Sequence, residues 1–388
     1  MGLLKMSLYG TRDAAQNWGN TVEKHLKEIG FTQGVASGNL YHHGERQIAT
    51  LVHGDDYVSV GSEAQVSWLK VELEKKYEIK TAVVGRRQGL KKEVRVLNRI
   101  IRWTESGWEY EADQRHGEII VKDTGMEDAK PVMTPTAEEK EEKDDEELME
   151  GQEVRWYRGV AARGIYLSID RPDTSFASKE ASRRMSKPKN VDGKRLKRLG
   201  RYLKGFPRVV QKFAWQEPDM EIRVYTDADW AGCKTSRKST SGGVIMRGTH
   251  CIKFWSKTQS SVVTSTAEAE LVALVKGTSE AKGVASIMRD VSGKEPGKIG
   301  VYTDASAAIG ITQRQGIGKT RHIDVGLLWI QQSAKRGEVD INKVEGARNP
   351  ADIFTKAVPA EVIWRHMVAM GYENREGRAE EAIQLVEQ

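Results

Sequence analysis

The stretch "VYTDADWAGCKTSRKSTSGGVIM", residues 224–246, contains two segments typical of β-strands, joined by turn-forming and basic residues. Side chains two positions apart in a strand point to the same face, so Asp227 shares a face with Tyr225 and Asp229. Unpaired acids are uncommon inside strands. A turn accounts for Asp229, but Asp227 lies further inside the strand, which indicates a functional carboxylate.

The sequence that follows predicts a compact α/β unit. Apolar and polar residues alternate over 221–230, and β-rich segments follow closely. The expected order is strands at 221–230, 242–246 and 251–256, a helix over about 267–288, a strand at 299–304, a helical region, a strand near 338–346 and a short helix from Asn349. This order predicts one mixed sheet flanked by helices.

Two glutamates at the start of the long helix have different expected roles. Ser265 followed three residues later by Glu268 is a capping box, in which each side chain satisfies a backbone N–H at the helix start. Glu270 lies about 200° further around the helix, so it cannot share that role. Its carboxylate is expected to face the core or a site.

Two further acids stand at the ends of regular elements and have structural alternatives. Asp304 follows the strand at 299–304 and precedes a helical stretch, so it is either an N-cap or a site residue. Asp352 falls in the first turn of a helix capped by Asn349, where the helix dipole favours an acid. Neither acid alone decides between the two readings.

The four acids, if they meet in space, predict a metal site. Carboxylates raise one another's pKa and do not all stay ionised close together without cations. Their oxygens suit Mg²⁺, which keeps waters and substrate phosphate as its other ligands. Two such ions roughly 4 Å apart can activate a water and stabilise the leaving oxygen of a phosphodiester. The pattern therefore indicates nuclease chemistry.

Composition sets limits on the class of protein. The 388 residues are 38% hydrophobic and 30% charged, with no apolar run long enough to span a membrane, so neither a span nor a membrane partner is expected. The N-terminus lacks a secretory pattern, which predicts an intracellular protein, cytoplasmic or nuclear. Cys233 and Cys251 are too few for a disulfide framework or a cysteine zinc site. A net charge of +6 is compatible with a polyanionic partner.

Charged segments mark the expected joints and the candidate phosphate contacts. Residues 136–153 are mostly acidic and predict a solvated linker, whereas residues 182–205 are basic and become helical in their second half. That basic segment is either a solvated helix face or a phosphate-tracking patch. Residues 233–241 are either a phosphate-binding loop or an exposed hairpin. The candidate contacts are Lys194, Arg195, Lys197 and Arg198 in the basic segment and Lys234, Arg237, Lys238 and Ser239 in the loop.

Several motifs resemble one family, the Pol polyproteins of copia-type retrotransposons. "YTDADWAG…RKSTSGGVIM", "WSKTQSSVVTSTAEAELVAL", "TRHIDV" and "NPADIFTKA" occur in that family's order at similar spacing. The resemblance implies a ribonuclease H-like mixed five-stranded sheet with flanking helices. It also implies an Asp-Glu-Asp-Asp active site, with catalytic and metal-binding roles for Asp227, Glu270, Asp304 and Asp352.

The N-terminal part resembles the reverse transcriptase of the same polyproteins. "LYGTRDAAQNW", residues 8–18, and "LVHGDDYVSVG", residues 51–61, match family segments, the second with His53 and Gly54 in place of Tyr and Val. Asp55 and Asp56 are then metal ligands of a polymerase remnant, whereas without the resemblance they belong to an ordinary hairpin turn. The family's further metal-binding aspartate lies upstream of this sequence, so we expect a truncated α+β palm and thumb remnant without polymerase activity.

The resemblance implies a function and a domain plan. The expected activity is Mg²⁺-dependent cleavage of the RNA strand of RNA–DNA hybrids, with two ions and Mn²⁺ as the alternative metal. The upstream Pol segments or another polyprotein chain are further expected partners. The alternative is a non-catalytic nucleic-acid-binding remnant. The expected regions are a partial reverse transcriptase (1–135), an acidic linker (136–153), a connection segment (154–215), a ribonuclease H-like domain (216–360) and a peripheral tail (361–388).

Overall fold

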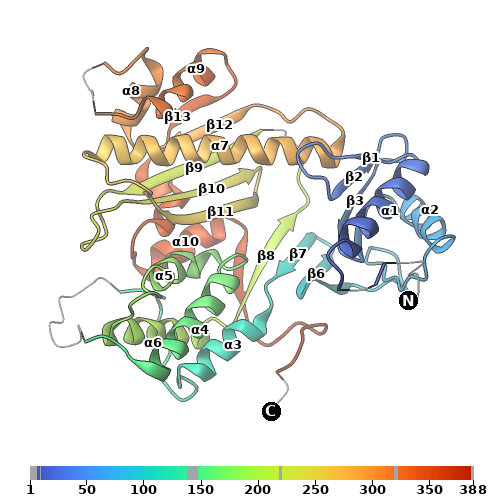
Figure 1. Ribbon diagram of the computed structural model, residues 1–388, viewed down its shortest axis with the longest axis horizontal. Helices are drawn as coiled ribbons and strands as arrows, with labels where there is room; N and C mark the ends of the chain where they lie inside the picture. Colours follow the sequence, from blue (N-terminus) through green and yellow to red (C-terminus); the bar gives the residue numbers. More distant parts are fainter. Residues whose placement is uncertain (1–6, 9, 138–146, 218–220, 319–321, 386–388) are drawn as a thin grey trace, which may run out of the picture. The chain divides into compact units, whose positions relative to one another are not determined.

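The computed structural model describes residues 7–8, 10–137, 147–217, 221–318 and 322–385 (Figure 1). The chain divides into two compact units. Unit 1 comprises residues 1–82 and 282–297, and unit 2 comprises residues 83–281 and 298–388. No helix within the described ranges combines the length and the apolar character needed to cross a bilayer.

Unit 1 is an antiparallel sheet with two helices and its own core. The sheet has the order β1-β2-β3-β4, and the turn between β3 and β4 contains Gly54, whose φ of +63° suits glycine. The predicted hairpin around Asp55 and Asp56 is therefore present. The elements are α1 (Ala14–Glu28), β1 (Thr32–Gln33), β2 (Leu40–His43), β3 (Ile48–His53), β4 (Asp56–Val60) and α2 (Glu63–Glu74). Their apolar faces bury Leu26, Ile48 and Leu69.

The predicted mixed sheet is confirmed in unit 2. Its order is β11-β10-β9-β12-β13, with β9, β10 and β11 antiparallel and β9, β12 and β13 parallel. The strands are β9 (Ile222–Asp229), β10 (Thr240–Arg247), β11 (His250–Thr258), β12 (Ile299–Thr303) and β13 (Asp340–Lys343). The helices along this stretch are α7 (Thr266–Ser292), α8 (Ser306–Gln313), η2 (Val325–Leu328), α9 (Trp329–Lys335), η3 (Gly346–Arg348), η4 (Pro350–Phe354) and α10 (Ala360–Ala369).

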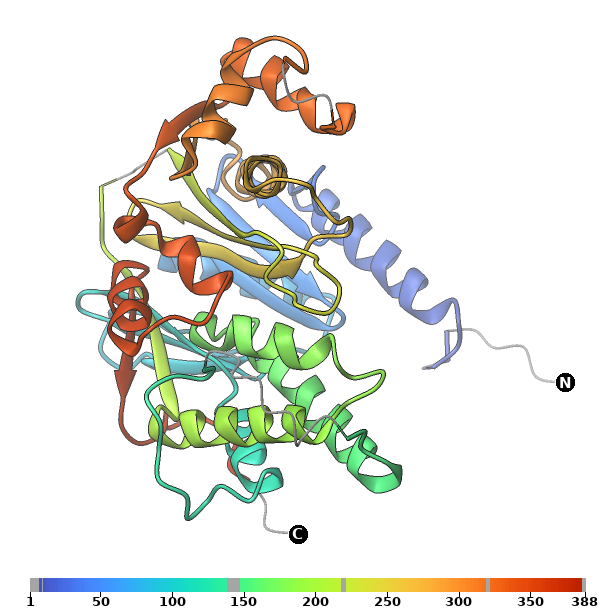
Figure 2. The same cartoon turned by 90° about the vertical axis from the view of Figure 1, so that its left-hand side faces the viewer.

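Alternation along β9 explains how both faces of this sheet are covered. Val224 and Thr226 are fully buried. The helix α7 lies over one face of the sheet (Figure 2), and its Gly277 approaches both residues. Gly277 permits this approach, because a Cβ there would lie 2.3 Å from Thr226 Cγ2. Tyr225 belongs to the other face and packs against a cluster that contains Phe354 of η4. The first strand is thus held between two layers.

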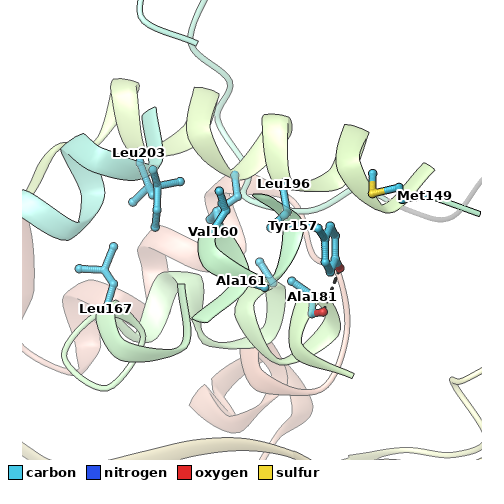
Figure 3. Packing of buried hydrophobic residues seen from close by; sticks show 11 residues of the cluster. Met149, Tyr157, Val160, Ala161, Leu167, Ala181, Leu196 and Leu203 are labelled. Carbon is cyan, nitrogen blue, oxygen red and sulfur yellow. Dashed lines mark hydrogen bonds between the residues drawn. The ribbon is translucent and has the colours of Figure 1, made fainter. Parts of the chain in front are cut away.

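The rest of unit 2 is a second five-stranded sheet and a group of helices. The sheet is antiparallel in the order β14-β8-β7-β6-β5. Its strands are β5 (Glu93–Val96), β6 (Arg99–Thr104), β7 (Gly107–Glu111), β8 (Arg208–Ala214) and β14 (Tyr372–Arg375), and the helices are α3 (Gln114–Asp123), α4 (Gly151–Leu167), α5 (Pro172–Ser182) and α6 (Asn190–Gly205). Figure 3 shows the helical core, in which Tyr157 donates a hydrogen bond to the Ala181 carbonyl at 2.9 Å.

The structure corrects one part of the predicted domain plan. Residues 361–388 were expected to be peripheral, which is wrong for α10 and β14. Met367 of α10 and Tyr372 of β14 are buried in the cluster that also covers the β9–β11 sheet, and β14 pairs with β8. The segment is rich in charge, but its apolar residues gather on one side of α10. Half of the predicted acidic linker, residues 138–146, lies outside the described residues, and its last three residues belong to α4. The remaining domain boundaries stay predictions.

Candidate active site

Three of the four predicted acids converge in unit 2. Asp227 lies near the end of β9, Glu270 in the first turns of α7, and Asp304 directly after β12. Each offers one carboxylate oxygen, and these three oxygens lie within 4.8 Å of one another. Because β9 and β12 are parallel neighbours, their ends meet at one edge of the sheet, which is also where α7 begins (Figure 1).

Local capping separates Glu268 from Glu270, as the sequence predicts. The Glu268 N–H donates to Ser265 Oγ at 3.2 Å, but the Glu268 carboxylate accepts from the Thr264 N–H at 2.8 Å and not from Ser265. The Glu268 carboxylate therefore has a structural role at the start of α7, but its donor is the N–H of Thr264 instead of the expected N–H of Ser265. The N-cap alternative for Asp304 is not found, because α8 begins at Ser306 after Ala305.

Burial and mutual repulsion make the acid cluster costly to ionise without a cation. Asp227 and Glu270 are each 6% exposed. Burial raises the pKa of the Asp227 carboxyl above its ordinary value. Burial, together with the charges of Asp227 and Asp304, raises the pKa of Glu270 to about 8. These shifts show a site that favours either protons or bound cations.

The donor set fits a divalent cation. Glu270 Oε1 accepts from the Ala228 N–H at 3.3 Å, whereas its buried Oε2 has no hydrogen-bond partner among the described residues. A buried carboxylate oxygen without a partner is unfavourable in a folded protein. Mg²⁺ prefers oxygen ligands, and one or two carboxylates usually hold it while waters fill its other positions. Asp227, Glu270 and Asp304 could therefore hold such an ion.

Asp352 takes a different place from the other three acids. It lies in η4, and its Oδ1 is 2.5 Å from the Lys356 ammonium. Burial alone would lower the pKa of Lys356, but the hydrogen bond to Asp352 and the charge of Asp227 raise it. The predicted cap by Asn349 is confirmed, since its Oδ1 accepts from the Ala351 N–H at 3.1 Å. The fourth acid is thus near the cluster but paired with a lysine.

Two residues beside Asp352 escape the sequence analysis. Lys356 brings a positive charge to the site, and Thr355 donates a hydrogen bond from Oγ1 to Asp227 Oδ2 at 2.5 Å. Both stand in the quoted motif "NPADIFTKA". Lys356 lies four residues after Asp352, which is the spacing of an ion pair on a helical turn. This spacing could have predicted the pairing of the two residues from the sequence.

The residues predicted to contact phosphates in the 233–241 loop divide into two kinds. Lys234 and Arg237 are exposed and Lys238 is partly exposed. Ser239 is fully buried, and its hydroxyl accepts from the Ala231 N–H at 3.0 Å. The prediction of a nucleic-acid contact is therefore wrong for Ser239, because its side chain is used inside the hairpin.

The basic residues of α6 also have uneven surroundings. Lys194 and Lys197 are exposed. Arg195 pairs with Asp192 at 2.6 Å, and Arg198 donates to Thr134 Oγ1 at 2.7 Å. The two arginines thus have protein partners and the two lysines are open to solvent, and a phosphate contact stays a prediction for all four.

Asp55 and Asp56 form no comparable cluster. Both are exposed at the β3–β4 turn. Within the part of the chain that the structure describes, the acids at 227, 270 and 304 are the one group of three that could hold a metal ion. The pair in unit 1 therefore lacks a third ligand among the described residues.

The "TRHIDV" motif contributes a helix start. Asp324 Oδ1 accepts from the Gly326 N–H at 2.7 Å and caps η2. His322 Nε2 lies 3.8 Å from Glu268 Oε2 near the start of α7.

The sheet order, the strand directions and the acids at its edge define a ribonuclease H-like α/β fold. No family model matches the chain. The chain is 26% identical over 367 residues to the "Retrovirus-related Pol polyprotein from transposon TNT 1-94" of Nicotiana tabacum, an alignment that covers 92% of this chain and 27% of that protein. The chain belongs to the copia-type, retrovirus-related Pol polyproteins of transposons. It spans about a quarter of the length of these relatives.

Two solved structures are similar to parts of the chain. One is LC11-RNase H1 in complex with RNA/DNA hybrid, 15% identical, with a TM-score of 0.26 over 34% of this chain and 93% of that one. The other is the foamy viral protease-reverse transcriptase in complex with dsDNA, 13% identical, with a TM-score of 0.45 over 87% of this chain and 60% of that one.

The raised pKa of Glu270 predicts how the stability of the metal-free protein depends on pH. The folded state holds the Glu270 proton up to about pH 8, whereas the unfolded state releases it near the ordinary value of 4.5. The unfolded state therefore binds fewer protons in this window, and stability falls as the pH rises. Glu270→Gln removes the ionisable group, so we expect it to stabilise the metal-free protein at pH 8 by up to about 4 kcal/mol.

Thermal unfolding in a chelator at pH 5, 6.5 and 8 measures this effect. Glu268→Gln is the matched control, because it changes a capping glutamate two residues away, and its effect should be similar at each pH. A difference between Glu270→Gln and the unaltered protein that stays constant across the three pH values would contradict the prediction.

Proposed function

We propose that this chain carries a divalent-metal-dependent endonuclease that hydrolyses the RNA strand of RNA–DNA hybrids. It would act within a retrotransposon Pol polyprotein during reverse transcription. The observation that carries the proposal is the convergence of three carboxylates, with a buried Glu270 oxygen that has no hydrogen-bond partner among the described residues. An intracellular setting, cytoplasmic or nuclear, stays a prediction from the sequence.

Each residue of the site has a role in this proposal. Asp227, Glu270 and Asp304 would hold Mg²⁺, with Mn²⁺ as the alternative, and Asp352 is proposed as the fourth acid. A bound divalent ion supplies an activated water and stabilises the leaving oxygen of the phosphodiester. Thr355 orients the Asp227 carboxylate through its hydrogen bond. Lys356 holds Asp352 and keeps a positive charge beside the acids where the phosphate would approach.

The proposed substrate follows from the surroundings of the site and from the family. The exposed Lys234 and Arg237 lie in the loop that connects β9, which carries Asp227, to β10. Cationic side chains of this kind contact phosphates without reading sequence. Choice of a hybrid would rest on contacts to 2′-hydroxyl groups in the minor groove. Other segments of the Pol polyprotein are proposed partners.

Cleavage of a hybrid whose RNA strand is labelled tests the proposal. We expect the RNA strand to be cut in Mg²⁺ and to stay intact in a chelator. Double-stranded DNA and single-stranded RNA should not be cut under either condition. Hybrid binding without cutting at any Mg²⁺ or Mn²⁺ concentration would favour the non-catalytic binding remnant. RNA-directed DNA synthesis is not proposed, since Asp55 and Asp56 have no third acid beside them among the described residues.

A further inference from the structure

We infer that Trp230 is a binding platform for a nucleotide of the hybrid, placed directly beside the acid cluster. This inference rests on the proposed function and deepens it by assigning a contact to the substrate. Trp230 follows β9 immediately and lies three residues after Asp227. Its side chain is 44% exposed. Nearly half of this large aromatic residue is therefore open to solvent and available for contact with a ligand.

The indole is fixed in place in spite of its exposure. Its Nε1–H donates to the Val263 carbonyl at 3.2 Å, in the segment that leads into α7. This hydrogen bond therefore links the end of β9, which carries Asp227, to the segment before α7, which carries Glu270. A hydrogen bond at the ring edge satisfies the polar atom and leaves the ring face available for contact. A side chain that is already ordered loses little conformational entropy when it binds a ligand.

The backbone after Trp230 is held in an unusual conformation. Ala231 has a φ of +53°, in the left-handed region that non-glycine residues rarely adopt. Its N–H donates to the buried Ser239 hydroxyl at 3.0 Å. Gly232 is required next, because a Cβ there would lie 1.7 Å from Asp229 Oδ2. The fold thus maintains a strained turn that presents Trp230, and such strain is common at functional sites.

The charges around the ring indicate the occupant. The loop that follows contains Lys234 and Arg237, both exposed, whereas Asp229, the residue before Trp230, is partly buried. An exposed aromatic face beside basic side chains is the arrangement that binds nucleic acids, in which rings contact bases or sugars and cations contact phosphates. In an A-like helix the wide, shallow minor groove displays the sugars. We therefore assign to Trp230 a nucleotide next to the phosphate that is cut.

Binding of a fluorescent RNA–DNA hybrid in a chelator tests the platform, because binding is then measured without cleavage. We expect Trp230→Ala to weaken binding about tenfold, within the range for loss of one base–aromatic contact. Trp230→Phe keeps a ring and should weaken binding less than about threefold. The matched control is Trp215→Ala: Trp215 is 59% exposed and its indole N–H also donates to a backbone carbonyl, that of Glu105 at 2.9 Å. This control should bind as the unaltered protein does.

The salt dependence of binding separates the ring from the charges. Trp230→Ala should leave the slope of log affinity against log salt unchanged, whereas Arg237→Gln should reduce it by about one. Two results would overturn the inference. One is that Trp230→Ala binds the hybrid with unaltered affinity, and the other is that Trp215→Ala loses as much affinity as Trp230→Ala does. Thermal unfolding first shows whether Trp230→Phe is folded. If the folded Trp230→Phe variant binds the hybrid as weakly as Trp230→Ala does, the inference also fails. Hybrid binding without cleavage by the unaltered protein would refute the proposed nuclease but not this contact.

Discussion

Replacing Asp227 by Asn is expected to reduce metal-dependent cleavage of the RNA strand by about a thousandfold or more. The substitution keeps the shape of the side chain and an oxygen that can accept the Thr355 hydrogen bond. It removes one negative charge from a group of three acids, of which Asp227 and Glu270 are buried and Asp304 is partly buried. Loss of a ligand that holds the ion is worth several kcal/mol of transition-state stabilisation, and each 1.36 kcal/mol is tenfold in rate.

The same variant should bind Mg²⁺ more weakly, which calorimetry measures without reference to activity. Its fold should survive, because the amide is easier to bury than the carboxylate whose pKa burial raises. Asp55→Asn is the matched control: it removes an exposed acid from unit 1 and should leave cleavage unchanged. Cleavage by Asp227→Asn at the unaltered rate, or an equal loss in Asp55→Asn, would contradict the assigned site.

Much of the acid cluster could be predicted from the sequence because its signals are local. Asp227 interrupts a strand pattern, and the capping of α7 through Ser265 leaves Glu270 without a structural role. The surroundings of the acids could not be predicted in this way. Thr355 reaches Asp227 across 128 positions, and the pairing of Asp352 with Lys356 depends on where η4 packs against β9 and β10. Such contacts are set by tertiary packing, which no local pattern encodes.

The fold shows the same division between local and distant information. The β9–β13 sheet was predictable because its strands have β-rich or alternating patterns and short connections. The roles of α10 and β14 were not, since their sequence is charged and their partners are distant. Tyr372 of β14 aligns with Gln211 of β8, on the far side of the whole β9–β13 segment. The sequence therefore predicted residues 361–388 to be peripheral, although α10 and β14 complete the core that contains Met367 and Tyr372.

Residues 216–360 alone, the ribonuclease H-like domain expected from the sequence, should not unfold cooperatively. The cluster behind β10 and β11 buries ten residues, and five of them lie outside that range: Val209, Ile363, Met367, Met370 and Tyr372. Full burial of one such side chain is worth about 1.5–3 kcal/mol. Five losses together amount to roughly 10 kcal/mol, which is the whole stability of an ordinary domain. Residues 83–388 keep all ten and should show a single cooperative transition in urea.

A pair of adjacent residues in the full chain tests the same argument without truncation. Met367 is fully buried in this cluster, whereas Val368, the next residue of α10, is 66% exposed. Met367→Ala should lower the free energy of unfolding by about 3 kcal/mol, because it leaves a cavity in a packed core. Val368→Ala should change it by less than about 0.5 kcal/mol. Equal small effects of the two substitutions, or a cooperative transition of residues 216–360, would show that α10 is dispensable. The expected result instead makes α10 and β14 part of the structural support of the candidate active site.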